Sequence, residues 1–498
     1  MNRYNKITAQ EAATLIKHKY IVGIGGFSSV GTPKAVPTAL AQYAQAQHEQ
    51  GIEFQIGLIT GGATGNAIDG ALSQADAVLF RTPFQSNKDM RSAINEKKIA
   101  YFDLHLSHIA QDIKYKFLPK IDIAIIEASE ITDDGEITLT TSVGISPTLL
   151  MQAEKIIIEL NKAHDKKLKG MHDIYIPINP PYRKEIPIYH VNDHIGNASI
   201  KINPQKIIAI VETNERDNIL PFTPINKTTQ QIGYNVAQFL LKEWEKGNIP
   251  KEFLPIQSGV GNIANAVLGT LGEDKRLPAF CMFTEVIQNS VIDLMEKGTI
   301  QFATGSSLTL SEEHLDTIYN NLHFFKNRIL LRPQEITNHP EVIRRLGVIA
   351  INTALEADLF GNINSTHTFG SKIINGIGGS ADFSRNAYIS IFTTPSTAKN
   401  GLISSIVPHV SHVDSTEHDV RVLITEQGIA DLRGKSPFQK AQCIIENCAH
   451  PDYKQILWDY LNLSKNQSFH IPFNLKNAFQ MHLAFEETGN MKNTKFIM

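Results

Sequence analysis

The stretch Ala279-Phe280-Cys281-Met282-Phe283-Thr284-Glu285 contains the most informative pattern in this chain. Five largely apolar residues in succession are typical of a short strand that is buried on both faces of a parallel sheet. The strand runs into a glutamate, and burying a carboxylate without partners costs free energy. In open α/β sheets, ligands bind beyond the carboxyl ends of the strands. The stretch therefore predicts an α/β fold with Glu285 at a ligand-binding edge.

Strands and helices alternate on both sides of this stretch. Short apolar runs at 53–60, 122–127 and 206–212 predict further strands. Apolar residues at helical spacing predict helices at 231–246 and 286–297. Alternating β and α elements imply mainly parallel sheets that are covered by helices.

The chain of 498 residues is too long for one hydrophobic core. Prolines and polar residues at 217–224 separate a finished strand from a new helix, which is where a boundary between domains is expected. We therefore predict two open, mainly parallel α/β domains at 1–220 and 221–498, with Glu285 in the second.

Composition excludes several classes of function. The formal charge of −3, with 42% hydrophobic and 19% charged residues, is typical of a globular protein and gives no basic surface for nucleic acid. There is no apolar signal segment and no apolar run long enough to span a membrane. The three cysteines have neither disulfide-framework nor zinc spacing. We expect a cytoplasmic protein with no nucleic-acid or membrane partner.

Two glycine loops accompany the strand that ends at Glu285: Ser258-Gly259-Val260-Gly261-Asn262 and Asn375-Gly376-Ile377-Gly378-Gly379-Ser380. Glycine lets the backbone approach a reacting group without a Cβ clash. The first loop also matches GxGxxA, and Glu285 follows at about the spacing of the acid that binds ribose in dinucleotide-binding folds. An NAD-dependent oxidoreductase is therefore an alternative, although no residues for hydride transfer stand out nearby.

Other catalytic patterns are weak or missing. Three histidines and three acids lie within residues 409–419, but without the helical spacing of an HExxH zinc site, so we interpret them as a polar loop and predict no metal site. Neither a GxSxG elbow nor a Walker A motif is present.

In these glycine loops and the Thr284-Glu285 pair, the chain resembles the acetyl-CoA hydrolase/transferase family, and within it the succinyl-CoA:acetate CoA-transferase group of class I CoA-transferases. The likeness extends over nearly the whole chain. Further blocks that carry it are Gly31-Thr32-Pro33-Lys34-Ala35-Val36-Pro37, Arg81-Thr82-Pro83-Phe84-Gln85-Ser86, Asp103-Leu104-His105-Leu106-Ser107 and Thr425-Glu426-Gln427-Gly428-Ile429-Ala430-Asp431-Leu432-Arg433-Gly434.

The resemblance implies a role for each matching residue. Glu285 would become a glutamyl-CoA thioester, and the backbone amides of Val260 and Gly379 would form the oxyanion hole. The residues implied in CoA binding are Gly259, Val260, Gly261, Asn262, Ile263, Asn375, Gly379 and Lys399. Glu426 and Arg216 would bind the small carboxylate, although the local order around Arg216 departs from the family pattern. Without the resemblance, Lys399 is a solvated turn lysine and Glu426 is a helix cap.

This chemistry suits a carboxylate, which is ionised at neutral pH and can attack a thioester without a general base. The resemblance implies ping-pong transfer of CoA between succinyl-CoA or acetyl-CoA and acetate, with no tightly bound cofactor and with a homodimer as the assembly. The nearest alternative is an acetyl-CoA hydrolase that uses the same glutamate. A non-catalytic CoA sensor is a further alternative.

Overall fold

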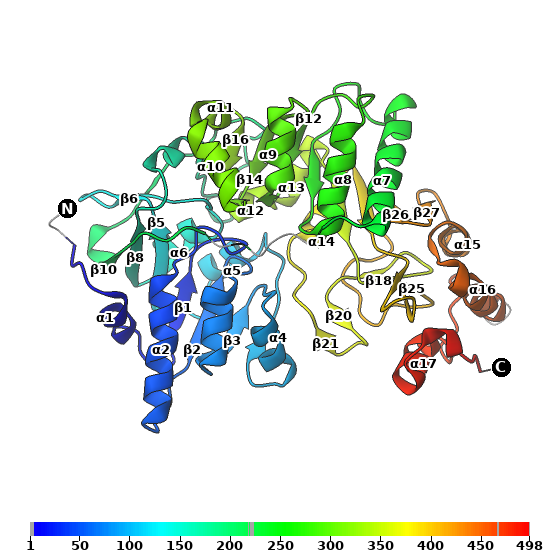
Figure 1. Cartoon of the computed structure of the whole chain (residues 1–498), viewed down its shortest axis with the longest axis horizontal. Coiled ribbons are helices and arrows are strands. Elements are labelled where there is room, and N and C mark those ends of the chain that lie inside the picture. The colour runs from blue at the N-terminus through cyan, green and yellow to red at the C-terminus, as the bar shows by residue number, and fades with distance from the viewer. Residues whose placement is uncertain (1–3, 218, 220–223, 466–467, 498) are drawn as a thin grey trace. The chain divides into compact units, whose positions relative to one another are not determined.

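The computed structural model describes residues 4–217, 219, 224–465 and 468–497 (Figure 1). Contacts within the chain divide it into two compact units. The first unit combines Met1–Pro221, Cys281–Leu346 and Asn375–Asp382, and the second combines Phe222–Phe280, Gly347–Ile374 and Phe383–Met498. The expected boundary between residues 220 and 221 lies outside the described residues.

A seven-stranded parallel sheet forms the centre of the first unit, in the order β10-β8-β5-β1-β2-β3-β4 (Figure 1). Its strands are β1 Ile21–Ile24, β2 Ile56–Thr60, β3 Val78–Thr82, β4 Ala100–Tyr101, β5 Ile123–Ala128, β8 Lys155–Asn161 and β10 Ile207–Thr213. All six residues of β5 are buried, which explains its continuous apolar sequence. The strands predicted at 53–60, 122–127 and 206–212 are thus confirmed, with ends shifted by up to three residues.

Helices cover both faces of this sheet. Val22 and Ile24 belong to a buried cluster with side chains of α1 (Ala9–Thr14) and α2 (Ala35–Glu49). Gly23 lies between them and faces Leu149 of α6 (Ser146–Gln152), so α6 covers the other face. The remaining elements of residues 1–221 are a π-turn at Asn66–Gly70, α3 Ala71–Gln74, α4 Lys88–Asn95, α5 Ile109–Lys114, β6 Glu130–Ile131, β7 Glu136–Thr138, β9 Ile200–Lys201 and 3₁₀ turns at Lys166–Met171 and Pro204–Lys206.

Glu285 belongs to the first unit by its contacts, which differs from the expected division of the chain. The neighbouring strands, β12 Phe280–Phe283, β14 Ile300–Gly305 and β16 Ile329–Leu331, lie side by side. Backbone bonds tie this region to the N-terminal part of the chain: Val143 N to Ser306 O, Leu308 N to Thr141 O and Asp173 N to Leu331 O. Long-range hydrogen bonds, which a linear sequence does not reveal, therefore decide which unit holds the glutamate.

The other elements of segment 281–346 are short. The predicted helix at 286–297 begins three residues late, because Val286 and Ile287 form strand β13 and pair with β15. These elements are β13 Val286–Ile287, α9 Asn289–Glu296, β15 Ser307–Leu308, α10 Glu312–Asn320, α11 Leu322–Lys326, α12 Gln334–Thr337 and α13 Pro340–Leu346.

In the second unit, strands β11-β17-β22-β26-β27 lie in that order, with parallel pairs except β26 and β27. Their bounds are β11 Ile256–Ser258, β17 Ile349–Thr353, β22 Ile389–Thr393, β26 Val422–Thr425 and β27 Gly428–Asp431. Helix α7 (Lys227–Glu245) packs against α8 (Asn262–Glu273). The helix predicted at 231–246 thus begins at Lys227, because Asn226 and Thr229 cap it. The α/β fold with parallel sheets is confirmed.

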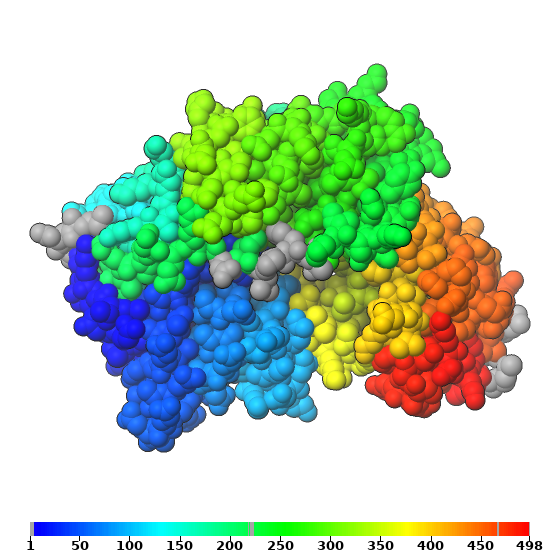
Figure 2. Space-filling view, viewed as in Figure 1, coloured from blue at the N-terminus to red at the C-terminus, as the bar shows by residue number. Residues whose placement is uncertain are grey.

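The C-terminal part of the second unit contains α15 Pro437–Cys448, α16 Pro451–Lys465, α17 Gln480–Thr488 and a 3₁₀ turn at Met491–Asn493, drawn in orange and red in Figure 2. Short strands are scattered through segments 347–374 and 383–431: β18 Glu356–Asp358, β19 Ile363–Asn364, β20 His367–Thr368, β21 Lys372–Ile373, β23 Thr397–Ala398, β24 Ile403–Ser404 and β25 Ile406–Val407. All three cysteines are free thiols. Within the described residues, no helix has the length and apolar character needed to cross a bilayer.

Candidate active site

Glu285 lies in the turn between β12 and β13. Backbone hydrogen bonds hold this turn on both sides, because Thr284 N donates to Thr304 O at 2.9 Å and Ser306 N donates to Glu285 O at 2.7 Å. Next to it, Val286 packs with Phe27 and Leu106 in a small apolar cluster. The backbone of Glu285 is therefore fixed, while the residue as a whole is partly exposed.

The second glycine loop, 375–379, is anchored to the chain that follows β4. Tyr101 Oη donates to Asn375 O at 2.7 Å, and Ile377 N donates to the carboxylate of Asp103 at 2.8 Å. Leu106 N donates to Gly378 O at 3.3 Å. These bonds hold the glycine loop against residues 101–106.

Gly379 stands directly against the nucleophile candidate. A β-carbon built on Gly379 would lie 1.8 Å from Glu285 Oε1 and 2.3 Å from Asn338 Nδ2. The structure thus brings Glu285 and Gly379 together, as predicted from the loop and the strand. Gly379 is buried, and its missing side chain leaves the space that the carboxylate occupies.

Asn338 holds the Glu285 carboxylate and was missed by sequence reasoning. Its Nδ2 donates to Glu285 Oε1, while its Oδ1 accepts a hydrogen bond from Thr337 Oγ1 at 2.9 Å. Asn338 lies just after α12 and is fully buried. No motif marks a single asparagine at the end of a four-residue helix, so only the fold reveals it.

Burial raises the pKa of Glu285 to about 7, partly opposed by the hydrogen bond from Asn338 and reinforced by the charge of Asp382. A carboxylate with a raised pKa is more basic than an ordinary glutamate, and it keeps a substantial ionised fraction at neutral pH. A dinucleotide-binding acid would need to be open to a ribose hydroxyl. Glu285 contacts Gly379 and Asn338, and an ionised carboxylate in this setting could act as a nucleophile.

Comparisons with known proteins show the family of this chain. The acetyl-CoA hydrolase/transferase N-terminal domain matches residues 1–212, and the C-terminal domain of the same family matches residues 315–461. The chain belongs to the acetyl-CoA hydrolase/transferase family. It is 50% identical to the propanoyl-CoA:succinate CoA transferase of Escherichia coli over 98% of this chain and 99% of that protein.

Other members of the family differ in activity. A succinyl-CoA:acetate CoA-transferase of Clostridium kluyveri is 50% identical, with 98% of this chain and 90% of that protein covered. An acetyl-CoA hydrolase of Saccharomyces cerevisiae is 42% identical, with 97% and 94% covered. Among solved structures, RipA from Yersinia pestis superimposes with a TM-score of 0.70 at 22% identity, covering 93% of this chain and 97% of that one. That likeness shows a shared fold.

The first glycine loop lies in the second unit, between β11 and α8. Gly261 adopts φ +113°, a conformation that only glycine accepts readily, and it directly precedes the first residue of α8, Asn262. Val260 is 51% exposed, so its side chain does not contribute to the core. Because α8 begins at Asn262, this family motif forms a glycine turn at a helix N-terminus.

Lys399 and Glu426 also lie in the second unit. Lys399 has φ +47° in an exposed turn, with its ammonium 4.9 Å from the ring centre of Phe485. Glu426 lies between β26 and β27 and accepts hydrogen bonds from Ser396 N, at 2.8 Å, and from Ser396 Oγ. The alternative of a helix cap for Glu426 is wrong, because the residues that follow form strand β27.

Arg216 lies after β10 in the first unit and carries two acidic neighbours. Its Nη1 lies 2.5 Å from Asp316 and 3.4 Å from Glu312, both in α10. Together with Lys34 it lines a pocket of about 570 Å³, whose other lining residues are Ser29, Thr32, Thr38, Thr64, Gly65, Asn66, Ala67, Ser86, Asn87 and Glu215. A substrate carboxylate at Arg216 would have to compete with Asp316.

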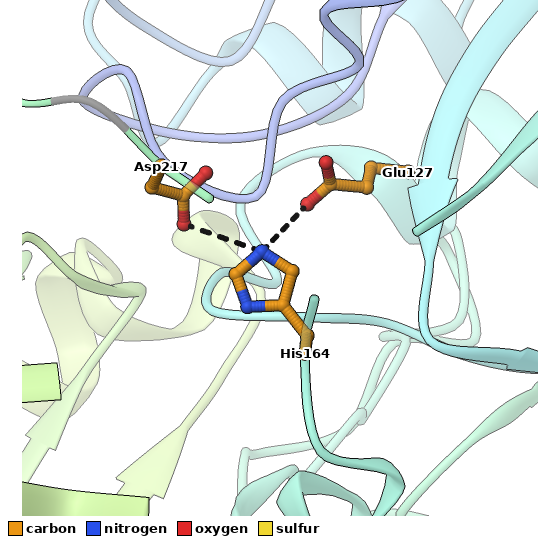
Figure 3. Close-up of side chains that lie close together, drawn as sticks. All are labelled: Glu127, His164 and Asp217. Atoms are coloured by element: carbon orange, nitrogen blue, oxygen red, sulfur yellow. Dashed lines mark ion pairs between the residues drawn. The ribbon is translucent and has the colours of Figure 1, made fainter. Parts of the chain in front are cut away.

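Glu127, His164 and Asp217 converge in the interior of the first unit (Figure 3). Within the described part of the chain, this is the group whose geometry would suit a metal ion. Lys34 Nζ, however, already lies 2.6 Å from Glu127 and 2.9 Å from Asp217. The cation of these carboxylates is therefore supplied by the chain itself, and a divalent ion would have to share them with an ammonium group.

The charges of this cluster are tightly coupled. Burial raises the pKa of Glu127, whereas for Asp217 the attraction of Lys34 and His164 outweighs burial and lowers the pKa. Asp217 also accepts hydrogen bonds from Gly31 N and Thr141 Oγ1. The cluster therefore fixes the side chain of Asp217, the residue that follows Arg216 in the chain.

Proposed function

We propose that this protein is a CoA-transferase that moves CoA between an acyl-CoA, such as succinyl-CoA or acetyl-CoA, and a small carboxylate such as acetate. The observation that carries the proposal is the setting of Glu285, a carboxylate with a raised pKa held by Asn338 against Gly379. The activities named for two relatives at 50% identity support the same conclusion.

In the first step, the ionised carboxylate of Glu285 attacks the thioester carbon of the acyl-CoA. A C–O bond forms, the C–S bond breaks, and the CoA thiolate leaves with the electron pair. The product on the enzyme is an acyl-glutamyl anhydride. No proton has to be transferred, so this step needs no general base.

In the second step, the thiolate attacks the carbonyl carbon of Glu285 and releases the first carboxylate. This step leaves a glutamyl-CoA thioester, and a second carboxylate then reverses the sequence. Each step passes through a tetrahedral oxyanion, which requires amide donors. We assign these donors to the backbone N–H groups of Gly379 and Val260, and losing one such donor typically raises a barrier by about 2.7–4 kcal/mol.

The other site residues complete the proposal. CoA would contact Gly259, Val260, Gly261, Asn262, Ile263, Asn375, Gly379 and Lys399, with the positive end of α8 available to a phosphate or to the oxyanion. Arg216 and Glu426 would bind the carboxylate substrate. We further propose that the protein needs no tightly bound cofactor or metal, forms a homodimer and acts in the cytoplasm, where its three free thiols would stay reduced.

Hydrolysis is the second candidate function, because relatives such as the Saccharomyces cerevisiae protein are named acetyl-CoA hydrolases. Water would replace the second carboxylate at the glutamyl thioester. Measuring the loss of acetyl-CoA with and without added succinate separates the two functions. A transferase requires the added acid, whereas turnover at the full rate without any acceptor would reject transfer.

Covalent catalysis itself is tested by intact mass. After incubation with acyl-CoA, the wild-type protein should gain the mass of CoA less one water, and mild borohydride should reduce the thioester and release CoA. The Glu285→Gln variant should remain unmodified. A wild-type protein that is active but never labelled would argue for direct transfer between the substrates.

A further inference from the structure

A second buried carboxylate, that of Asp382, is linked to Glu285 through one bridging residue, Asn338. Asp382 is in the first turn of α14 (Ser380–Asn386) and is 5% exposed. Ser107 N donates to Asp382 Oδ2 at 3.0 Å, and Ser107 Oγ donates to Oδ1 at 2.6 Å. Asn338 Nδ2 donates to Oδ2 at 3.3 Å. The amide that holds Glu285 is thus shared with another acid.

Asn338 Nδ2 donates to two carboxylates, one on Glu285 and one on Asp382. Thr337 Oγ1 donates to the opposite end of the amide. A flipped Asn338 would place its oxygen between the two acids, which is unfavourable when they are ionised, whereas the hydroxyl of Thr337 can accept as well as donate. Asp382 therefore favours, together with Glu285, the orientation in which the amino end of the amide faces the two acids.

We propose that Asp382 is a positioning residue for Glu285. It orients the Asn338 amide toward the nucleophile, and it places a second negative charge nearby that makes ionised Glu285 more reactive. This inference rests on the proposed function, in which Glu285 loses its charge when it forms an acyl derivative. Repulsion between the two acids is present before attack and is relieved as the charge leaves Glu285.

The two acids ionise in the same pH range, so the charge on Asp382 acts on Glu285 only once Asp382 is itself ionised. Burial raises the pKa of Asp382 to about 7, opposed by the hydrogen bonds from Ser107 and Asn338. Glu285 and His105 both face Asp382, with His105 Nδ1 at 3.8 Å from Oδ1. Asp382 accepts two bonds from Ser107 in addition to the shared amide, so hydrogen bonding favours the ionised form of Asp382 as well as that of Glu285.

The decisive experiment measures the single-turnover rate of CoA-adduct formation against pH. In Asp382→Asn, which keeps the shape but removes the charge, the rise in rate should move to lower pH by about one pH unit. Its plateau should fall by up to about tenfold, because a less basic Glu285 is a weaker nucleophile. In Asp382→Ala, which also releases Asn338, the plateau should fall by about 100-fold.

Asp358→Asn is the matched control, because Asp358 is a buried aspartate of the second unit that accepts hydrogen bonds from the backbone N–H groups of Phe360, Gly361 and Asn362. It should leave both the plateau and the pH profile unchanged. An Asp382→Asn profile that coincides with the wild type, or an Asp382→Ala plateau within about threefold of it, would overturn the inference.

Folding of each variant is checked by thermal unfolding. Should Asp382→Ala not fold, Ser107→Ala takes its place, since it removes one donor and leaves the acid; a plateau equal to that of the wild type would then count against positioning. If wild-type protein forms no CoA adduct at all, the proposed function fails. If wild type and Asp382→Asn are labelled at the same rate, only the role of Asp382 fails.

Discussion

Gly379 faces the carboxylate of Glu285 so closely that a β-carbon on Gly379 would stand 1.8 Å from Oε1. Real side chains do not tolerate such a distance, and the backbone on both sides is held by hydrogen bonds. The carboxylate itself would have to move. This relationship leads to the first prediction.

Gly379→Ala should reduce the transferase rate by about 100-fold or more, because displacing a reacting group by 1 Å is enough for such a loss. Steady-state transfer of CoA from succinyl-CoA to acetate measures it. Gly269→Ala, in α8, is the control, because a β-carbon there meets no described atom within 4 Å. It should keep full activity; equal losses in both variants would show that the effect is not specific to Glu285.

Glu285→Gln should abolish transfer and stabilise the fold at alkaline pH. The folded pKa of Glu285 is raised from 4.5 to about 7, so the folded state binds the proton more tightly and stability falls as pH rises through this range. At pH 8 the variant should gain about 1–3 kcal/mol in free energy of unfolding. The gain should vanish near pH 4, where both states of the wild type are protonated. Urea unfolding at the two pH values measures the difference.

Asn338→Ala should act on Glu285 in the opposite direction from Asp382→Asn. Its amide lowers the pKa of Glu285, so its loss should move the rise of activity to higher pH. The plateau should fall by about 10- to 100-fold, because the carboxylate is no longer oriented. A pH–rate profile of adduct formation measures both effects. A shift toward lower pH would contradict this account of the amide.

Arg216→Gln should raise the KM for the carboxylate substrate by about tenfold or more while leaving the KM for acyl-CoA nearly unchanged. Steady-state kinetics with each substrate varied in turn separates the two constants. Arg276→Gln is a suitable control, since Arg276 is also an exposed arginine paired with an aspartate, Asp274. If both KM values for Arg216→Gln match the wild type, the carboxylate binds elsewhere.

Lys34→Met should destabilise the first unit strongly. It would leave Glu127 and Asp217 buried without their ammonium partner, and breaking a buried ion pair typically costs about 3–5 kcal/mol. Chemical unfolding at pH 7 measures the loss. Lys162→Met removes an exposed pair with Glu212 and should change stability by less than about 1 kcal/mol. Comparable losses in the two variants would mean that the interior cluster is not held by charge.

The sequence was informative where local pattern and chemistry coincide. An apolar run that ends in a glutamate predicted both the strand and the position of Glu285, because a buried strand excludes polar residues until its end. The glycine loop at 375–379 was also recognisable from the sequence. Its glycines are required by the structure, because any side chain at Gly379 would displace the carboxylate of Glu285.

The residues that hold the nucleophile could not be predicted in this way. Asn338 and Asp382 are separated from Glu285 by dozens of residues and belong to no motif that demands an amide or an acid. The assignment of Glu285 to the first unit likewise depends on hydrogen bonds such as Val143 N to Ser306 O. Such tertiary contacts are set by the whole fold rather than by local sequence preference.

The bond between Ser107 and Asp382 joins residues 275 positions apart. During synthesis, the segment that contains Glu285 emerges from the ribosome well before residues 379 and 382, so a nascent chain carries the glutamate without its surroundings. Contacts of such long range form late in folding. The reactive carboxylate would thus be assembled only once most of the polypeptide exists, and incomplete chains would be inert toward the cell's thioesters.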